Sequence, residues 1–162
     1  MKAINNKTSF LRYLVLLTIS IFTLQINIAQ ANHTPTLAFK TKELPGKYFH
    51  FIAKAHSQAY DKTLKCTYLK FYHPNLRKDL LNKFRTETIT YTFKDYDPDY
   101  PGECAYTYPG WFGQNTIRLK NLAFTKLCGK LSSVIFHEMI HLAWTWGSEK
   151  EVSHIENLCY QH

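Results

Sequence analysis

The segment Val134-Ile135-Phe136-His137-Glu138-Met139-Ile140-His141-Leu142-Ala143-Trp144 sets the expectation for the whole chain. It contains the pattern H-E-x-x-H, and its only charged or imidazole side chains belong to His137, Glu138 and His141. On a helix, two histidines four residues apart lie one turn apart on the same face. They can bind one Zn²⁺ there, with Glu138 beside them to hold the metal's water. A solvated helix face would carry polar neighbours. Here the neighbours are apolar, so we expect a buried helix whose polar face binds a metal.

The first residues of the chain have the pattern of an export signal. Lys2, Lys7 and Arg12 form a positive region, residues 13–24 are an apolar core, and Ala29-Gln30-Ala31 is typical of a cleavage site. The apolar run is short for a membrane span. We therefore predict a signal peptide over 1–31, a mature chain from Asn32, and no stable membrane association after its removal. The protein is expected to be exported, and periplasm and extracellular space stay open.

Length and charge limit the classes of protein that fit. A chain of 162 residues, 131 of them mature, is enough for one domain. The signal holds three of the 20 Lys and Arg and none of the 12 acids, so the mature net charge is +5. These cations are spread along the chain, with no basic run or nucleic-acid motif. The sequence predicts no nucleic-acid partner and does not predict an oligomeric state.

The mature chain keeps an even number of cysteines, which in an exported domain indicates two disulfides. They are Cys66, Cys104, Cys128 and Cys159. Three pairings are compatible with the sequence. No C-x-x-C pair is present, which argues against a cysteine zinc site.

The first half of the mature chain reads as a leader followed by helices. Residues 32–47 contain Pro and Gly breakers and are predicted to be irregular, so that a single domain spans 48–162. Residues 48–60 have helical apolar spacing, and His56 within them is expected at the surface or the edge of the core. Residues 64–72 fit a strand or a helix, and residues 76–84 a short helix.

The second half adds strands. Residues 87–93 alternate between apolar and threonine side chains, and residues 104–108 and 115–119 also read as strands. Together they predict a small antiparallel sheet, and hence an α+β fold in which this sheet packs on the H-E-x-x-H helix and a C-terminal helix. Three aspartates in residues 95–102 are expected to form a solvated acidic turn, because an EF-hand's Gly and distal Glu are missing.

The last helix is expected to supply the third metal ligand. Ser148 and Glu151 form a capping box that starts a helix over about 149–160. A catalytic zinc takes three protein ligands, and Glu156 is preferred because it shares the apolar face of this helix. Glu149 at the helix start, Glu151 and His154 stay open as alternatives.

These residues resemble a known family. The segment from Leu131 to His141, followed by Glu156-x-x-Cys159-Tyr160, resembles zincin metallopeptidases, and among them the gluzincin-like metallopeptidase domains at the C-terminal ends of some bacterial polymorphic toxins. Cys104-x-x-x-x-Pro109-Gly110 and Cys128 fit the same pattern, and the similarity covers roughly the last 60 residues. It implies His137, His141 and Glu156 as zinc ligands and Glu138 as the base. The metzincin Gly and His positions hold Trp144 and Gly147 instead.

The function that follows is a secreted zinc metallopeptidase acting on a protein or peptide substrate. Zn²⁺ would activate water and Glu138 would accept its proton. Tyr106, Tyr108 and His154 are candidate donors to the oxyanion, and residues 104–108 or 115–119 are candidates for an edge strand that holds the substrate. Two alternatives stay open: a toxin or effector peptidase with one target, and a disulfide-stapled binding or structural protein in which the motif is inert.

Overall fold

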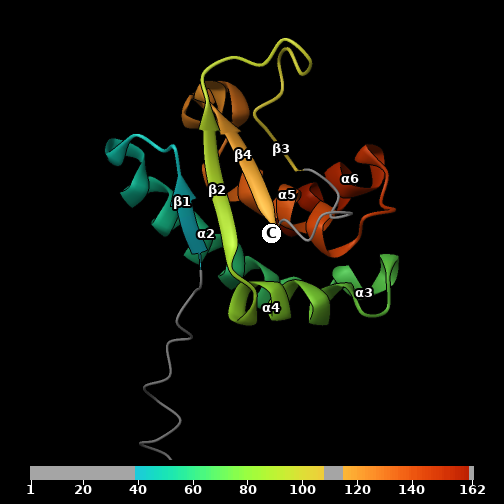
Figure 1. Ribbon diagram of the computed structural model, residues 1–162. Coiled ribbons are helices and arrows are strands. Elements are labelled where there is room, and N and C mark those ends of the chain that lie inside the picture. Colours follow the sequence, from blue (N-terminus) through green and yellow to red (C-terminus); the bar gives the residue numbers. More distant parts are fainter. Residues whose placement is uncertain (1–38, 108–114, 161–162) are drawn as a thin grey trace, which may run out of the picture. The chain divides into compact units, whose positions relative to one another are not determined.

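The computed structural model describes residues 39–107 and 115–160, which belong to one compact unit, Leu37–His162 (Figure 1). Its helices are α2 (Gly46–Lys65), α3 (Leu69–Tyr72), α4 (Leu76–Thr86), α5 (Leu131–Ala143) and α6 (Glu149–Tyr160), with 3₁₀ turns η1 (Asn121–Phe124) and η2 (Lys126–Cys128). Its strands are β1 (Phe39–Lys42), β2 (Ile89–Lys94), β3 (Ala105–Thr107) and β4 (Thr116–Lys120). The predicted signal peptide lies outside the described residues. Within the described part, no helix is long and apolar enough to span a membrane.

The fold is α+β, as expected, but the sheet is mixed rather than antiparallel. Its strand order is β1-β2-β4-β3, with β1 and β4 both parallel to β2 and only β3 antiparallel to its neighbour. Parallel neighbours need long crossover connections, and helices α2 to α4 make the one between β1 and β2. The expectation of an antiparallel sheet was wrong because side-chain alternation reports which face a residue occupies and not the direction of its neighbouring strand.

Strand β1 lies inside the segment that was predicted to be irregular. Phe39 pairs with Ile89 in register, and its ring packs against His56 and Tyr91 with centroids 5.1 and 5.6 Å away. The other three residues of β1 are exposed. A four-residue edge strand with one half-buried side chain has too little alternation to be recognised among the nearby prolines.

Helices α2 and α5 cover one face of the sheet (Figure 1). Ile52, Leu119 and Ile135 are fully buried where these layers meet. His56 lies in the same core and is completely buried, which corrects its expected surface or core-edge position. Its Nδ1 is 2.7 Å from the hydroxyl oxygen of Tyr91, and among the described residues its Nε2 has no hydrogen-bond partner. The pKa of His56 is lowered to about 4 because burial penalises the imidazolium.

The acidic turn before β3 is only partly solvated. Asp95 and Asp99 are exposed, as expected, but Asp97 is buried. Tyr106 donates a hydrogen bond to its Oδ2 atom, and the Lys94 ammonium lies 3.0 Å from the same atom. These two donors, Tyr106 first, hold the pKa of Asp97 at about 2. Asp97 thus ties the turn to the outer face of the sheet, a role that its sequence neighbours do not indicate.

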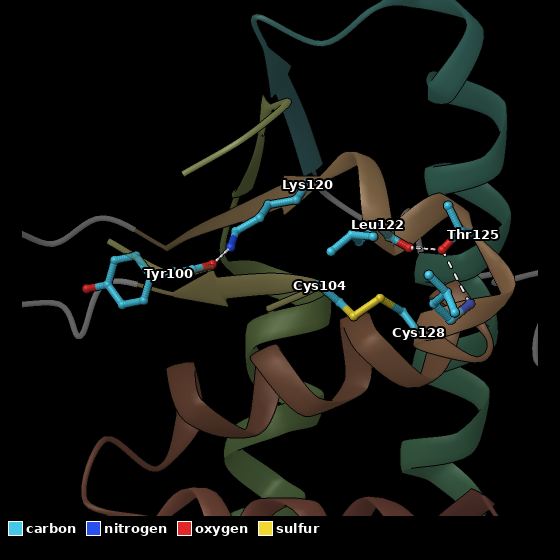
Figure 2. The surroundings of a disulfide bond; sticks show 7 residues. Tyr100, Cys104, Lys120, Leu122, Thr125 and Cys128 are labelled. Carbon is cyan, nitrogen blue, oxygen red and sulfur yellow. Dashed lines mark hydrogen bonds between the residues drawn. A yellow bond between two sulfur atoms is a disulfide. The ribbon is translucent and has the colours of Figure 1, made fainter. Parts of the chain in front are cut away.

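The four cysteines form two disulfides, Cys66–Cys159 and Cys104–Cys128, with Cα atoms 5.3 and 6.0 Å apart. The first joins the end of α2 to α6. The second joins the residue before β3 to the end of η2, three residues before α5 begins (Figure 2). In the same view Lys120 bonds the carbonyl of Tyr100, which fixes the approach to β3. Two disulfides fit an oxidising, exported location.

Candidate metal centre

Helix α5 presents the H-E-x-x-H residues as the sequence predicts. Four of its apolar residues are fully buried, which fixes the rotation of the helix about its axis: Ile135, Phe136, Met139 and Ile140. The side chains of His137 and His141 are 13% and 21% exposed, and their rings lie 5.0 Å apart between centroids. Glu138 is buried, with 6% of its surface exposed. The helix therefore holds two imidazoles side by side with a carboxylate next to them.

Glu149 completes a group that could hold a metal ion. Its two carboxylate oxygens lie 2.9 Å from Nε2 of His137 and 3.0 Å from Nε2 of His141. One ligand atom from each of the three residues falls within 4.8 Å of the others. A tetrahedral ion about 2.1 Å from each ligand separates those ligands by roughly 3.4 Å, which is compatible with a group whose ligand atoms all lie within 4.8 Å. Two imidazoles and a carboxylate are also a donor set that suits zinc.

The turn between α5 and α6 brings Glu149 to this position. Ser148 and Glu151 form the predicted capping box: the backbone N–H of Ser148 donates to Oε2 of Glu151 at 2.9 Å, and that of Glu151 to Oγ of Ser148 at 3.3 Å. The cap makes Glu149 the first residue of α6. Gly147 permits the tight turn, since a Cβ there would lie 2.7 Å from Cε3 of Trp144. The cap and the glycine turn together place the Glu149 carboxylate next to the end of α5.

Glu156 contacts the other side of His137. Its Oε2 lies 2.9 Å from Nδ1 of that ring, and its Oε1 accepts a hydrogen bond from the hydroxyl of Ser133. The group with metal-ligand geometry therefore contains Glu149 instead of the expected Glu156. A carboxylate on Nδ1 holds the proton on that nitrogen and leaves the Nε2 lone pair for a metal. Glu149 and Glu156 are seven residues apart on α6, so they share one face, and that spacing could have predicted both contacts.

The remaining candidates from the sequence lie elsewhere. Glu151 is exposed and occupied by the cap, and His154 is exposed with its ring against Tyr72. Tyr106 borders the site but its hydroxyl donates to Asp97, and Tyr108 lies outside the described residues. Among the described candidates, Glu151, His154 and Tyr106 are not part of the group with His137 and His141.

The charges of the site perturb its titrating groups. Burial raises the pKa of Glu138 to about 7, against the opposing charge of His137, with Glu149 and Glu103 adding to the rise. Burial lowers the pKa of His137, but its hydrogen bond to Glu156 and the charges of nearby carboxylates outweigh that effect and raise it. Burial, and then the charge of His137, lower the pKa of His141. A carboxylate that titrates near neutral pH is suited to accept and return a proton.

A cleft of about 590 Å³ opens over these residues. Its floor is the α5 face with His137, Glu138 and His141, and one wall is β3 with the preceding segment, Gly102 to Thr107. Strand β3 is at one edge of the described sheet, whereas β4 is paired on both sides. Two strands were predicted as candidates to bind the substrate, β3 and β4. Among the described strands only β3 of these two has a free edge, and β3 lies along the cleft. Thr107 on this strand lines the cleft with Glu138 and opposes the rise in the pKa of that carboxyl group.

Comparisons of the chain with protein-family models, with curated proteins and with solved structures find no match. The chemistry of the cleft is therefore argued from its own residues.

Proposed function

We propose that the protein is an exported, zinc-dependent metallopeptidase of the zincin type that hydrolyses peptide bonds in its cleft. One observation carries the proposal: Nε2 of His137 and of His141 converge on the Glu149 carboxylate, with Glu138 buried alongside. A carboxylate from another helix that meets both histidines at once supplies the third ligand that a zinc site needs. Glu138 is buried beside these groups, and burying a carboxylate is costly unless a cation or a donor compensates its charge.

Each residue has a part in the proposed reaction. His137, His141 and Glu149 would hold the metal, and Glu156 would orient the ring of His137 through Nδ1. When bound, zinc polarises the scissile carbonyl and lowers the pKa of water. Glu138 accepts a proton and returns it to the leaving amine, which its pKa of about 7 favours.

The edge of β3 gives the substrate a place to bind. An extended peptide can add to a free strand edge through main-chain hydrogen bonds. On β3 such a peptide would run above the face of α5 that carries Glu138. The Cys104–Cys128 disulfide holds this strand to the segment that leads into α5, so wall and floor keep a constant separation.

Two measurements test the proposal on the oxidised mature chain that begins at Asn32. Metal analysis should find one zinc per chain, lost in the His137→Ala variant. Incubation with a mixed peptide library should give cleavage that chelation stops and added zinc restores. The Glu138→Gln variant should keep its zinc and lose cleavage, because it keeps the ligands and removes the base.

The outcomes separate the proposal from its alternatives. A folded wild-type protein without zinc affinity would leave the chain as a disulfide-stapled binding or structural protein. Bound zinc with no cleavage of any library peptide would point to a peptidase with one protein target. Mass spectrometry of the protein exported from an expressing cell should find Asn32 as its first residue, and finding residues 1–31 still attached would refute the predicted signal peptide.

A further inference from the structure

The charge of the cleft is opposite to that of the chain. The full sequence carries a net charge of +8, yet none of the described residues that line the cleft is Lys or Arg. Four carboxylates line it: Glu103, Glu138, Glu149 and Glu156. Residues 108–114, which lie outside the described part, contain no charged residue in the sequence. Four carboxylates outweigh the charge of one divalent ion, so the cleft stays negative with a metal bound.

Glu103 is the one carboxylate that the proposed reaction does not use. Glu149 lies at the metal position, Glu156 on His137, and Glu138 beside them. Glu103 is exposed and lines the same cleft two residues before β3. Glu103 and Glu138 line the same cleft, and the charge of Glu103 contributes to the raised pKa of Glu138. Glu103 precedes the bend at Cys104, and it lines the cleft together with Ala105 and Thr107 of β3.

The two cations of β4 bind groups other than Glu103. Arg118 and Lys120 alternate with the fully buried Ile117 and Leu119 and lie on the outer face of β4. There Arg118 donates to the hydroxyl of Tyr106 at 3.0 Å, and Lys120 bonds the carbonyl of Tyr100 (Figure 2). No described cation forms an ion pair with Glu103. Its carboxylate is therefore available to a ligand that lies along β3.

We infer that the cleft selects peptides with a basic side chain, and that Glu103 is the residue that recognises the Lys or Arg of the substrate. The inference rests on the proposed peptidase function and adds its substrate class. A peptide on the β3 edge sends alternate side chains toward the cleft face of that strand. A cationic side chain there would meet Glu103, and an acidic one would meet four carboxylates. Complementary charge of this kind contributes specificity.

A binding assay tests this separately from hydrolysis. The Glu138→Gln protein, loaded with zinc, leaves peptides uncut. Its affinity is measured by fluorescence anisotropy for three labelled alanine-rich peptides that differ at one position, which is Lys, Gln or Glu. We expect the Lys peptide to bind about fivefold more tightly than the Gln peptide, the upper range for one exposed ion pair, with less difference at high salt. The Glu peptide should bind most weakly. The affinities of the same three peptides for the metal-free wild-type protein provide a second measurement of the preference.

Variants of Glu103 decide the outcome. Adding Glu103→Gln should remove most of the preference for Lys over Gln, and Glu103→Lys should reverse the order of the Lys and Glu peptides. Asp61→Asn is the matched control, because Asp61 is an exposed acid on α2 that does not line the cleft and its loss changes net charge equally. An unchanged preference in Glu103→Gln, or no binding of any peptide, overturns the inference. Binding with the expected preference but no hydrolysis by the wild-type protein refutes the proposed function alone.

Discussion

Replacing Glu149 and Glu156 separately by glutamine should have unequal effects on zinc affinity. Each carboxylate lies about equally near His137, with 2.9 Å from Glu149 to Nε2 and 2.9 Å from Glu156 to Nδ1. Glu149 alone also reaches Nε2 of His141, at 3.0 Å. These contacts favour Glu149 as the ligand and Glu156 as the residue that positions the ring of His137.

The expected magnitudes follow from these positions. Loss of an outer carboxylate that orients a ligating histidine lowers metal affinity about 10- to 100-fold, which is about 1.4 to 2.7 kcal/mol. Glu156→Gln should fall in this range. Glu149→Gln removes one of three protein ligands and should lower affinity by more than about 100-fold. Glu156 also raises the pKa of His137. Without it the ring binds protons less tightly, so protons compete less with zinc for His137, and zinc affinity should depend less on pH near neutrality.

Competition with a fluorescent zinc chelator measures both effects across a pH series. Glu151→Gln is the control, because Glu151 lies on the same helix and caps it without contacting either histidine. The Glu151→Gln variant should bind zinc with unchanged affinity, although the cap at the start of α6 is less stable. The assignment is refuted when Glu156→Gln loses more affinity than Glu149→Gln, since that order would make Glu156 the ligand. Thermal unfolding of the metal-free variants checks that each still folds.

Three other results are expected from the structure. The pKa of His56 is about 4 in the folded protein and about 6.5 in the unfolded chain. Between these pH values the unfolded chain binds a proton that the folded protein does not, so the folded protein becomes less stable as the pH decreases. This residue alone should lower the free energy of unfolding by about 2 kcal/mol from pH 7 to pH 5. Urea titrations should find that the pH dependence of His56→Leu is smaller by this amount, and equal slopes in the two proteins would contradict the buried neutral ring. Removing the Cys66–Cys159 disulfide, whose cysteines are 93 residues apart, should cost about 4.6 kcal/mol, and removing Cys104–Cys128, separated by 24, about 3.4 kcal/mol, as measured by urea unfolding of the double alanine variants. The Cys104–Cys128 variant should also lose peptide affinity under conditions where it is folded, because β3 is then no longer tied to the segment before α5, and unchanged affinity would argue against β3 as the substrate wall.

Much of the candidate site could be predicted from local sequence. The H-E-x-x-H spacing puts two imidazoles on one face of any helix, and the apolar residues between them bury that helix. The capping box at Ser148 set the start of α6 correctly, because a cap is made by residues three apart. These features depend on the regular geometry of one helix, which the order of residues specifies directly.

Local sequence could not identify the third residue of the group that could hold a metal ion. Glu149 and Glu156 share one face of α6, and both reach His137, but from opposite sides of its ring. Which nitrogen each one meets depends on how far α6 slides along α5. The turn at Gly147, the hydrogen bond from Tyr160 to the carbonyl of Ser132 and the Cys66–Cys159 disulfide set that position. The sequence correctly indicated that Glu156, on the apolar face of α6, needs a polar partner, and that partner is the imidazole of His137.

The sequence by itself determined the α5 and α6 helices, the positions of the two histidines and Glu138, and an even set of cysteines. Only the tertiary structure decided strand direction in the sheet, disulfide pairing, the burial of His56 and Asp97, and the meeting of Glu149 with both histidines. The physical reason is range. Helical periodicity and capping act within a few residues, whereas a metal-holding group, a strand pair or a disulfide needs atoms from distant segments to meet within a few ångströms. Their meeting depends on how the hydrophobic layers pack, and that packing is a property of the whole chain.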